Sequence, residues 1–176
     1  MKNKVLIFLA VLFCSSNAIA HSITLTNVSV DVHFSPNGGC TAAIIEVLDH
    51  AKSEILVQSY SFTSKPIAQA LVNAHKRGVH TRVILDRSNR SARYSAADFT
   101  AHMGIPTFID DAHAIAHNKI MIIDRETVIT GSFNFTKAAE ERNAENLLII
   151  RSKELARTYI DNWNTHHKHS DEYKGK

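Results

Sequence analysis

Residues 117–146 read HNKIMIIDRETVITGSFNFTKAAEERNAEN, and no other segment constrains the structure of this chain as strongly. His117 and Lys119 stand two residues apart at the start of a run of isoleucines that is typical of a core strand. Because side chains alternate across a strand, both are predicted to point to the same face of a sheet. A polar pair on an otherwise apolar strand is either solvated or functional.

The residue types favour phosphate chemistry over simple solvation. The imidazole of His117 is able to attack phosphorus or to move protons near neutral pH, and the Lys119 ammonium is able to neutralise phosphate oxygens. Glu145, further along the same segment, is a candidate to hold the second ring nitrogen of His117 and so to fix its tautomer. These three side chains together form a plausible catalytic group.

Two more polar residues extend this group, and a third has a different expected role. Ser132 and Asn134 are again two apart and offer neutral hydrogen-bond donors for phosphate oxygens. Asp124 stands where a strand meets a turn, so we expect it to cap the turn or brace nearby donors rather than to take part directly in chemistry.

The spacing of these residues resembles the signature of the phospholipase D superfamily. The pattern H-x-K-x(4)-D-x(6)-G-S, with an asparagine shortly after it, is formed by His117, Lys119, Asp124, Gly131, Ser132 and Asn134. The sequence N-x-E at residues 143–145 also fits the family. So many positions at fixed gaps are a strong signal of the family. In its length and its single motif, the chain looks like the bacterial Nuc-type endonucleases.

The resemblance implies a two-step mechanism that uses two histidines, one attacking phosphorus and the other acting as acid and then as base. A single motif then implies a homodimer with both copies of His117 in one site. Lys119, Ser132 and Asn134 would bind the phosphoryl oxygens, Glu145 would orient His117, and Asp124 would support the site. The reaction would need no metal and no cofactor, because the lysines supply the stabilising charge.

DNA is the expected substrate, cleaved with little sequence specificity, and RNA is a second candidate. Phospholipid remains an alternative, as does a catalytically silent nucleic-acid-binding protein. The chain has no obvious amphipathic helix rich in Trp or Phe, so no stable membrane association is expected. A loop containing Arg87, Arg90 and Arg93 follows the apolar segment ending at Asp86; it either contacts the DNA backbone or is simply a solvated surface loop.

Apolar periodicity predicts an α/β fold, with a mixed central sheet flanked by helices. The family resemblance implies that this is the phospholipase D-like α/β sandwich. Strands are expected at residues 28–34, 55–62, 79–86, 106–109, 115–123, 128–131 and 146–151. Helices are expected at residues 41–52, 66–77, 96–102 and from 153 towards 166. The segment around 124–127 is expected to turn the chain back in a hairpin, which makes the sheet mixed.

The N-terminus has the pattern of a signal peptide at residues 1–20, followed by a single phospholipase D-like nuclease domain at 21–176. Lys2 and Lys4 precede a short apolar run that closes on Ala18-Ile19-Ala20. The run is too short to span a bilayer, which disfavours a membrane anchor. We therefore expect a periplasmic or secreted protein. Loss of the two lysines lowers the excess of basic over acidic side chains from three to one, so attraction to phosphate must be local.

Three further features are weighed against plain alternatives. The tract at residues 166–169, HHKH, resembles a metal-binding sequence, but its position at the chain end favours a solvated basic tail. His113 and Asp111 precede the catalytic strand and are either auxiliary site residues or ordinary loop polarity. Cys40 remains as a lone cysteine after cleavage and is expected to be a small buried side chain on a helix.

Overall fold

The computed structural model describes residues 22–92 and 95–176. The predicted signal peptide and Arg93 lie outside these residues. The strands are β1 Ser29–Ser35, β2 Glu54–Ser59, β3 His80–Asp86, β4 Thr107–Asp110, β5 Lys119–Ile123, β6 Thr127–Gly131, β7 Glu145–Arg151 and β8 Asp171–Tyr173. The helices are α1 Cys40–Asp49, α2 Lys65–Lys76, the 3-10 turn η1 Arg87–Arg90, α3 Ala96–His102, α4 Lys137–Glu141 and α5 Lys153–His167.

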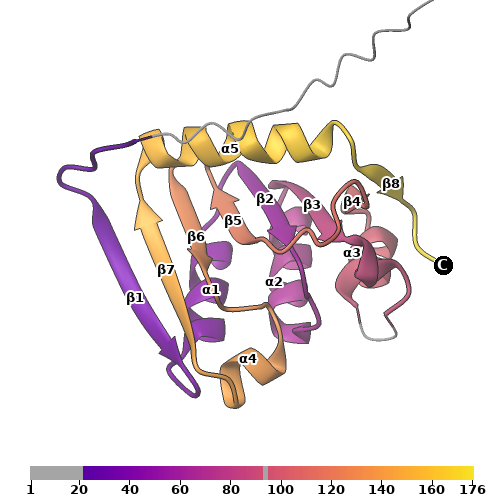
Figure 1. Ribbon diagram of the computed structural model, residues 1–176, viewed down its shortest axis with the longest axis horizontal. Coiled ribbons are helices and arrows are strands. Elements are labelled where there is room, and N and C mark those ends of the chain that lie inside the picture. The colour runs from indigo at the N-terminus through magenta and orange to yellow at the C-terminus, as the bar shows by residue number, and fades with distance from the viewer. Residues whose placement is uncertain (1–21, 93–94) are drawn as a thin grey trace, which may run out of the picture.

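The strands form one eight-stranded sheet in the order β1-β7-β6-β5-β2-β3-β4-β8 (Figure 1). Strands β2, β3 and β4 are parallel, whereas the other neighbouring pairs are antiparallel. The predicted hairpin is present between β5 and β6, where Asp124 and Arg125 take the positive φ angles of 53° and 59° that tight hairpin turns need. The predicted mixed sheet with flanking helices is therefore confirmed.

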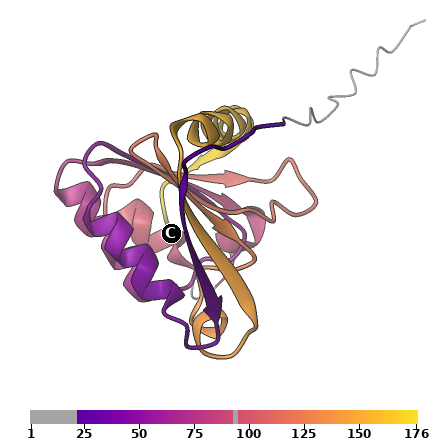
Figure 2. The same cartoon turned by 90° about the vertical axis from the view of Figure 1, so that its left-hand side faces the viewer.

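Helices cover both faces of the sheet because its central strands are apolar on both sides. Residues 55–59 of β2 are all buried, as are all of β5. Helices α1 and α2 pack over one face, in a core that also holds the fully buried Cys40 thiol. Helix α5 runs across the opposite face, over Leu56, Ile84 and Ile122 (Figures 1 and 2). This two-sided burial makes the central strands apolar over most of their length.

One expected strand begins later than the sequence suggests. Residues 115–118 are not in the sheet, because β2 ends at Ser59, which pairs with Lys119, and no strand lies beyond it to pair with them. The backbone of this segment is held instead by Ala116 N–H donating to Asp86 Oδ2 (2.8 Å) and by Tyr60 N–H donating to the Asn118 carbonyl (2.8 Å). His117 therefore precedes the strand on which it was expected.

The C-terminal segment also differs from expectation. Residues 166–169 are not a solvated tail, because α5 continues to His167 and β8 then pairs with β4. The His166 side chain is only 15% exposed and contacts the buried carboxylate of Asp110 at 2.7 Å. The short helix α4 and strand β8 were not predicted, since each is too brief to show a period in the sequence.

Within the described part of the chain, no helix combines the length and the apolar character that crossing a membrane requires.

Candidate active site

The polar residues of the sequence signature, apart from Asp124, gather at one edge of the sheet. Strands β7, β6, β5 and β2 are consecutive neighbours, and at this edge β5 and β7 begin while β6 and β2 end. Lys119, Glu145, Gly131 and Ser59 are the strand residues that stand there. Side chains separated by up to 86 positions in the chain thus come from adjacent strand ends.

Lys119 is the buried cation of this edge, with 7% of its surface exposed. Its ammonium donates to the His117 carbonyl at 2.8 Å and lies 5.1 Å from the centre of the Tyr60 ring. Burial lowers the pKa of Lys119, while the nearby Glu145 carboxylate acts to raise it. A lysine held this way presents a partly desolvated positive charge, which interacts more strongly with a phosphate than a solvated one does.

The exposed His117 ring is held by a short loop and an aromatic neighbour. The Tyr60 ring lies beside it, with ring centroids 4.6 Å apart. Asp86, which is 3% exposed, anchors Ala116, the residue before His117, by accepting a hydrogen bond from the Ala116 N–H. Sequence reasoning missed both Tyr60 and Asp86 as positioning residues. Their place at the carboxyl ends of two neighbouring parallel strands is a signal that was available, because ligand sites of parallel sheets form there.

Ser132 and Gly131 are packed against the start of β7. Gly131 has φ 146°, and a Cβ there would lie 2.2 Å from the Asn146 carbonyl oxygen, so only glycine fits. The exposed Ser132 has its hydroxyl oxygen accepting from Asn146 N–H at 3.1 Å, which leaves its O–H free to donate to a bound group.

Asn134 and Glu145 complete the edge. The Asn134 amide oxygen is buried and has no hydrogen-bond partner among the described residues. Glu145 accepts from the Asn143 side chain at 3.0 Å, and no hydrogen bond joins it to His117 within the described residues. The role of Glu145 in orienting His117 therefore stays a prediction, although its effect on the pKa of Lys119 places its charge near this edge.

Asp124 stands at the far end of β5 from Lys119. The strand from Lys119 to Ile123 spans roughly 13 Å, and Asp124 follows its last residue. There the Asp124 carboxylate accepts from the backbone N–H groups of Lys52, Ser53 and Glu54 at 2.7 to 3.0 Å, and from the Ser53 hydroxyl. Burial acts to raise the pKa of Asp124, but these hydrogen bonds outweigh it and lower that pKa overall. This geometry supports the hairpin and the turn before β2.

The basic loop after β3 is only partly available to a ligand. Arg87 and Arg90 are both exposed on η1, next to Asp86. The Arg90 guanidinium lies 3.8 Å from the Asp111 carboxylate and 3.5 Å from that of Asp171, whereas Arg87 has no ion pair among the described residues. Contact of this loop with DNA stays a prediction, and of its two described arginines Arg87 is the one without an ion pair.

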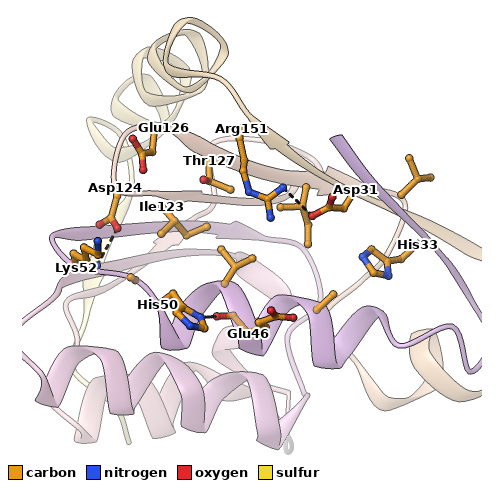
Figure 3. Close-up of a pocket in the computed structure, with 15 residues that line it drawn as sticks. Asp31, His33, Glu46, His50, Lys52, Ile123, Asp124, Glu126, Thr127 and Arg151 are labelled. Atoms are coloured by element: carbon orange, nitrogen blue, oxygen red, sulfur yellow. Dashed lines mark hydrogen bonds and ion pairs between the residues drawn. The ribbon is translucent and has the colours of Figure 1, made fainter. Parts of the chain in front are cut away.

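A large groove lies on the helix α1 side of the sheet; Asp124 lines it, whereas His117 and Lys119 do not (Figure 3). It has a volume of about 820 Å³ and extends from β1 to the β5–β6 hairpin, over the end of α1. Some of its charged groups have partners within the protein: Arg151 pairs with Asp31 at 2.8 Å, and the Asp124 carboxylate accepts from the Lys52 N–H. The proposed phosphate-binding residues Lys119, Ser132 and Asn134 do not line this groove.

Comparison with known families and proteins agrees with this geometry. The family model described as "Cardiolipin synthase, PLD-like domain" matches residues 44–166, which include every signature residue. The chain belongs to the phospholipase D superfamily. It is 46% identical over 139 residues to a phospholipase D of Rickettsia felis, covering 79% of this chain and 70% of that protein. It is also 30% identical over 118 residues to the mouse mitochondrial cardiolipin hydrolase, covering 67% of this chain and 53% of that protein.

Solved structures share the fold, and one of them is a phospholipase D family member. The phospholipase D family member Nuc from Salmonella typhimurium superposes with a TM-score of 0.81 at 38% identity, covering 85% of this chain and all of Nuc. NucT from Helicobacter pylori shares the fold, with a TM-score of 0.77 at 21% identity. This phospholipase D superfamily protein is therefore an enzyme, a hydrolase of phosphodiesters, and the edge with His117 and Lys119 carries the family signature.

Proposed function

We propose that the protein is an exported, metal-independent endonuclease that cleaves DNA with little sequence specificity, as a homodimer. The observation that supports this most directly is the convergence of His117, Lys119, Ser132 and Asn134 at one sheet edge in a chain that matches the whole length of Nuc. The exposed Arg87 at the end of the neighbouring strand β3 adds a contact for a long polyanion. RNA is a second substrate of the same chemistry.

In the proposed reaction, a ring nitrogen of His117 attacks the phosphorus of the scissile phosphodiester. A P–N bond forms, the P–O bond to one sugar breaks, and the leaving oxygen takes a proton from His117 of the partner subunit. That second histidine then removes a proton from water, and the resulting hydroxide attacks phosphorus and releases His117. Lys119, with Ser132 and Asn134, stabilises the charge on the phosphoryl oxygens throughout. A site of this kind exists only where two copies of the chain meet.

Plasmid DNA cleavage in excess EDTA tests the proposal. Wild-type protein is expected to nick and linearise the plasmid, and His117→Ala, prepared identically, to lose this activity. His80→Ala is the matched control, since His80 is an exposed histidine at the opposite end of β3. Activity that disappears in EDTA for a protein shown to remain folded would contradict metal independence. Equal cleavage by His117→Ala would contradict the assignment of the nucleophile.

A second candidate is hydrolysis of phospholipid by the same residues. It is favoured by the names of the curated relatives, phospholipase D and mitochondrial cardiolipin hydrolase. Vesicles containing cardiolipin and phosphatidylcholine, incubated with the protein and analysed for released phosphatidic acid or headgroup, distinguish the two substrates. Hydrolysis of the vesicle phospholipid by wild type but not by His117→Ala, with the plasmid left intact, would favour phospholipid over DNA as the substrate.

A further inference from the structure

Four potential metal ligands meet at the end of β4, in a place that the proposed reaction does not use. They are Asp110, His113, His166 and His169, and one ligand atom from each lies within 4.8 Å of the others. Asp110 Oδ2 lies 3.2 Å from His113 Nδ1, 2.7 Å from His166 Nδ1 and 3.4 Å from His169 Nε2. The imidazole nitrogens thus converge on one carboxylate oxygen.

The chain brings these ligands together in two pairs, each spaced three residues apart. Asp110 and His113 belong to β4 and the loop after it, while His166 and His169 belong to the end of α5 and the turn that follows. Helix α5 fixes His166, and the pairing of β8 with β4 returns the chain past the same strand end. The histidine-rich sequence near the C-terminus thus has a fixed scaffold that the sequence alone did not reveal.

The ligand types and spacing suit zinc. Three imidazoles and one carboxylate are ordinary Zn²⁺ ligands, and a tetrahedral site with bonds of about 2.0 to 2.1 Å places its ligand atoms roughly 3.3 Å apart. The distances from Asp110 Oδ2 to His113 and His169 match this separation, the distance to His166 is shorter at 2.7 Å, and all four ligand atoms lie within 4.8 Å of one another. Asp110 is fully buried, and no lysine or arginine in the described ranges 22–92 and 95–176 forms an ion pair with it.

The position of the cluster indicates what a bound ion would do. His113 lies four residues before His117, on the same loop, and Asp171 of β8 approaches Arg90 of η1 at 3.5 Å. An ion held by all four residues would join the C-terminal segment to the loop that leads to His117. It would lie apart from Lys119, because two strands, β2 and β3, stand between β4, which carries Asp110, and β5.

We propose that Asp110, His113, His166 and His169 form a structural Zn²⁺ site that fastens the end of α5 and strand β8 to the loop preceding His117. The site is independent of the reaction. Related transition metals such as Co²⁺ and Ni²⁺ bind the same ligands, with affinities set by the usual order for divalent ions. In this role the ion contributes to folding stability, as closed four-ligand zinc sites do.

Isothermal titration calorimetry of chelator-stripped protein with ZnCl₂ tests this inference, and the Tm of thermal unfolding is a second measurement. We expect one ion per chain and, with Zn²⁺ in large excess over its dissociation constant, a rise in Tm on the order of 5 °C relative to protein in EDTA. His169→Ala and His166→Ala are expected to weaken Zn²⁺ binding at least tenfold and to remove the Tm shift. His80→Ala, which removes an exposed histidine elsewhere, should leave both unchanged.

Co²⁺ provides a readout of geometry. The intense visible absorption of a tetrahedral Co²⁺ centre is expected for wild type and His80→Ala, and not for His169→Gln, whose partly exposed side chain is the safest one to replace without unfolding the protein. Absence of stoichiometric Zn²⁺ binding by folded wild type would overturn the proposal. Binding that persists unchanged in both His166→Ala and His169→Ala would also overturn it, because the ion would then lie elsewhere. Neither measurement depends on catalysis.

Discussion

At the scale of single residues, the buried Lys119 ammonium supplies positive charge to the candidate active site but lowers the stability of the folded protein. Burial lowers its pKa, so the folded state disfavours the ammonium and is destabilised in full at pH values below that lowered pKa. The penalty disappears as the pH rises from the lowered pKa towards 10.5, the ordinary value. Lys119→Met is therefore expected to raise the free energy of unfolding at pH 7 by on the order of 1 kcal/mol, and to lower activity about 100-fold or more.

Urea denaturation of wild type and Lys119→Met between pH 7 and 10 checks this expectation. The difference in stability should narrow as the pH rises. Lys76→Met, at an exposed position near the end of α2, serves as the control and should show no such trend. A Lys119→Met protein that is less stable than wild type at every pH would contradict the reasoning.

The ionised Asp124 side chain stabilises the folded protein, whereas the charged Lys119 side chain destabilises it. Its pKa in the folded protein is below 3.8, so its ionised form stabilises the fold above that pH, and the contribution is lost as the pH falls through the lowered pKa. Asp124→Asn is expected to lower the free energy of unfolding by about 1 to 3 kcal/mol at pH 7, because a charged acceptor of backbone N–H groups is weakened. The difference from wild type should shrink in acid, as followed by urea denaturation.

The nuclease activity of Asp124→Asn distinguishes a structural role of Asp124 from a role in the chemical reaction. Since Asp124 lies at the far end of β5 from Lys119, the rate per folded molecule should remain within a factor of a few of wild type at temperatures well below Tm. Asp49→Asn, at the exposed end of α1, is the control for a changed surface charge. A large loss of kcat in folded Asp124→Asn would show that the residue reaches the reacting groups of the assembled protein.

At the scale of elements, helix α5 depends on one tryptophan for its place on the sheet. Trp163 is 1% exposed, and its indole N–H donates to the Val57 carbonyl of β2 at 2.9 Å. The Arg82 guanidinium and the His167 ring lie over it, at 4.7 and 5.0 Å from its centre. Trp163→Ala is expected to lower the free energy of unfolding by about 3 to 5 kcal/mol in chemical denaturation. Asn162→Ala, the exposed neighbour on the same helix, should change it by less than about 0.5 kcal/mol.

At the scale of the whole molecule, the proposed homodimer makes activity depend on pairs of chains. If each site needs His117 from both subunits, a dimer with one His117→Ala chain is inactive. Refolding wild type together with this variant at constant total protein should lower activity with the square of the wild-type fraction, to about a quarter at equal amounts. A linear fall would show that each chain works alone. Recovered activity on mixing two different inactive His117 variants would also contradict the shared site.

Much of the fold could be predicted because apolar periodicity records which face of each element is buried. The helix at residues 96–102 was placed at its observed bounds, and the strands of β3 and β7 within one residue. The extra strand length assigned before Lys119 was wrong because Ile115 and Ala116 are apolar without being part of the sheet. Ile115 is 57% exposed, and Ala116 is a buried loop residue whose N–H donates to Asp86. Composition alone does not separate such a loop from a strand end.

The family signature, the alternation of strands and helices, and the residue types available for phosphate chemistry could all be read from the chain, because these are properties of neighbouring positions. The order of strands in the folded protein was needed to show that Tyr60 lies beside His117 and that Asp124 lies apart from it. The folded structure also shows that His166 meets Asp110 across 56 residues of chain. Contacts of this kind follow from the order of strands in the sheet and from the docking of α5. Neither can be predicted from local sequence patterns, because both depend on residues that are distant in the chain.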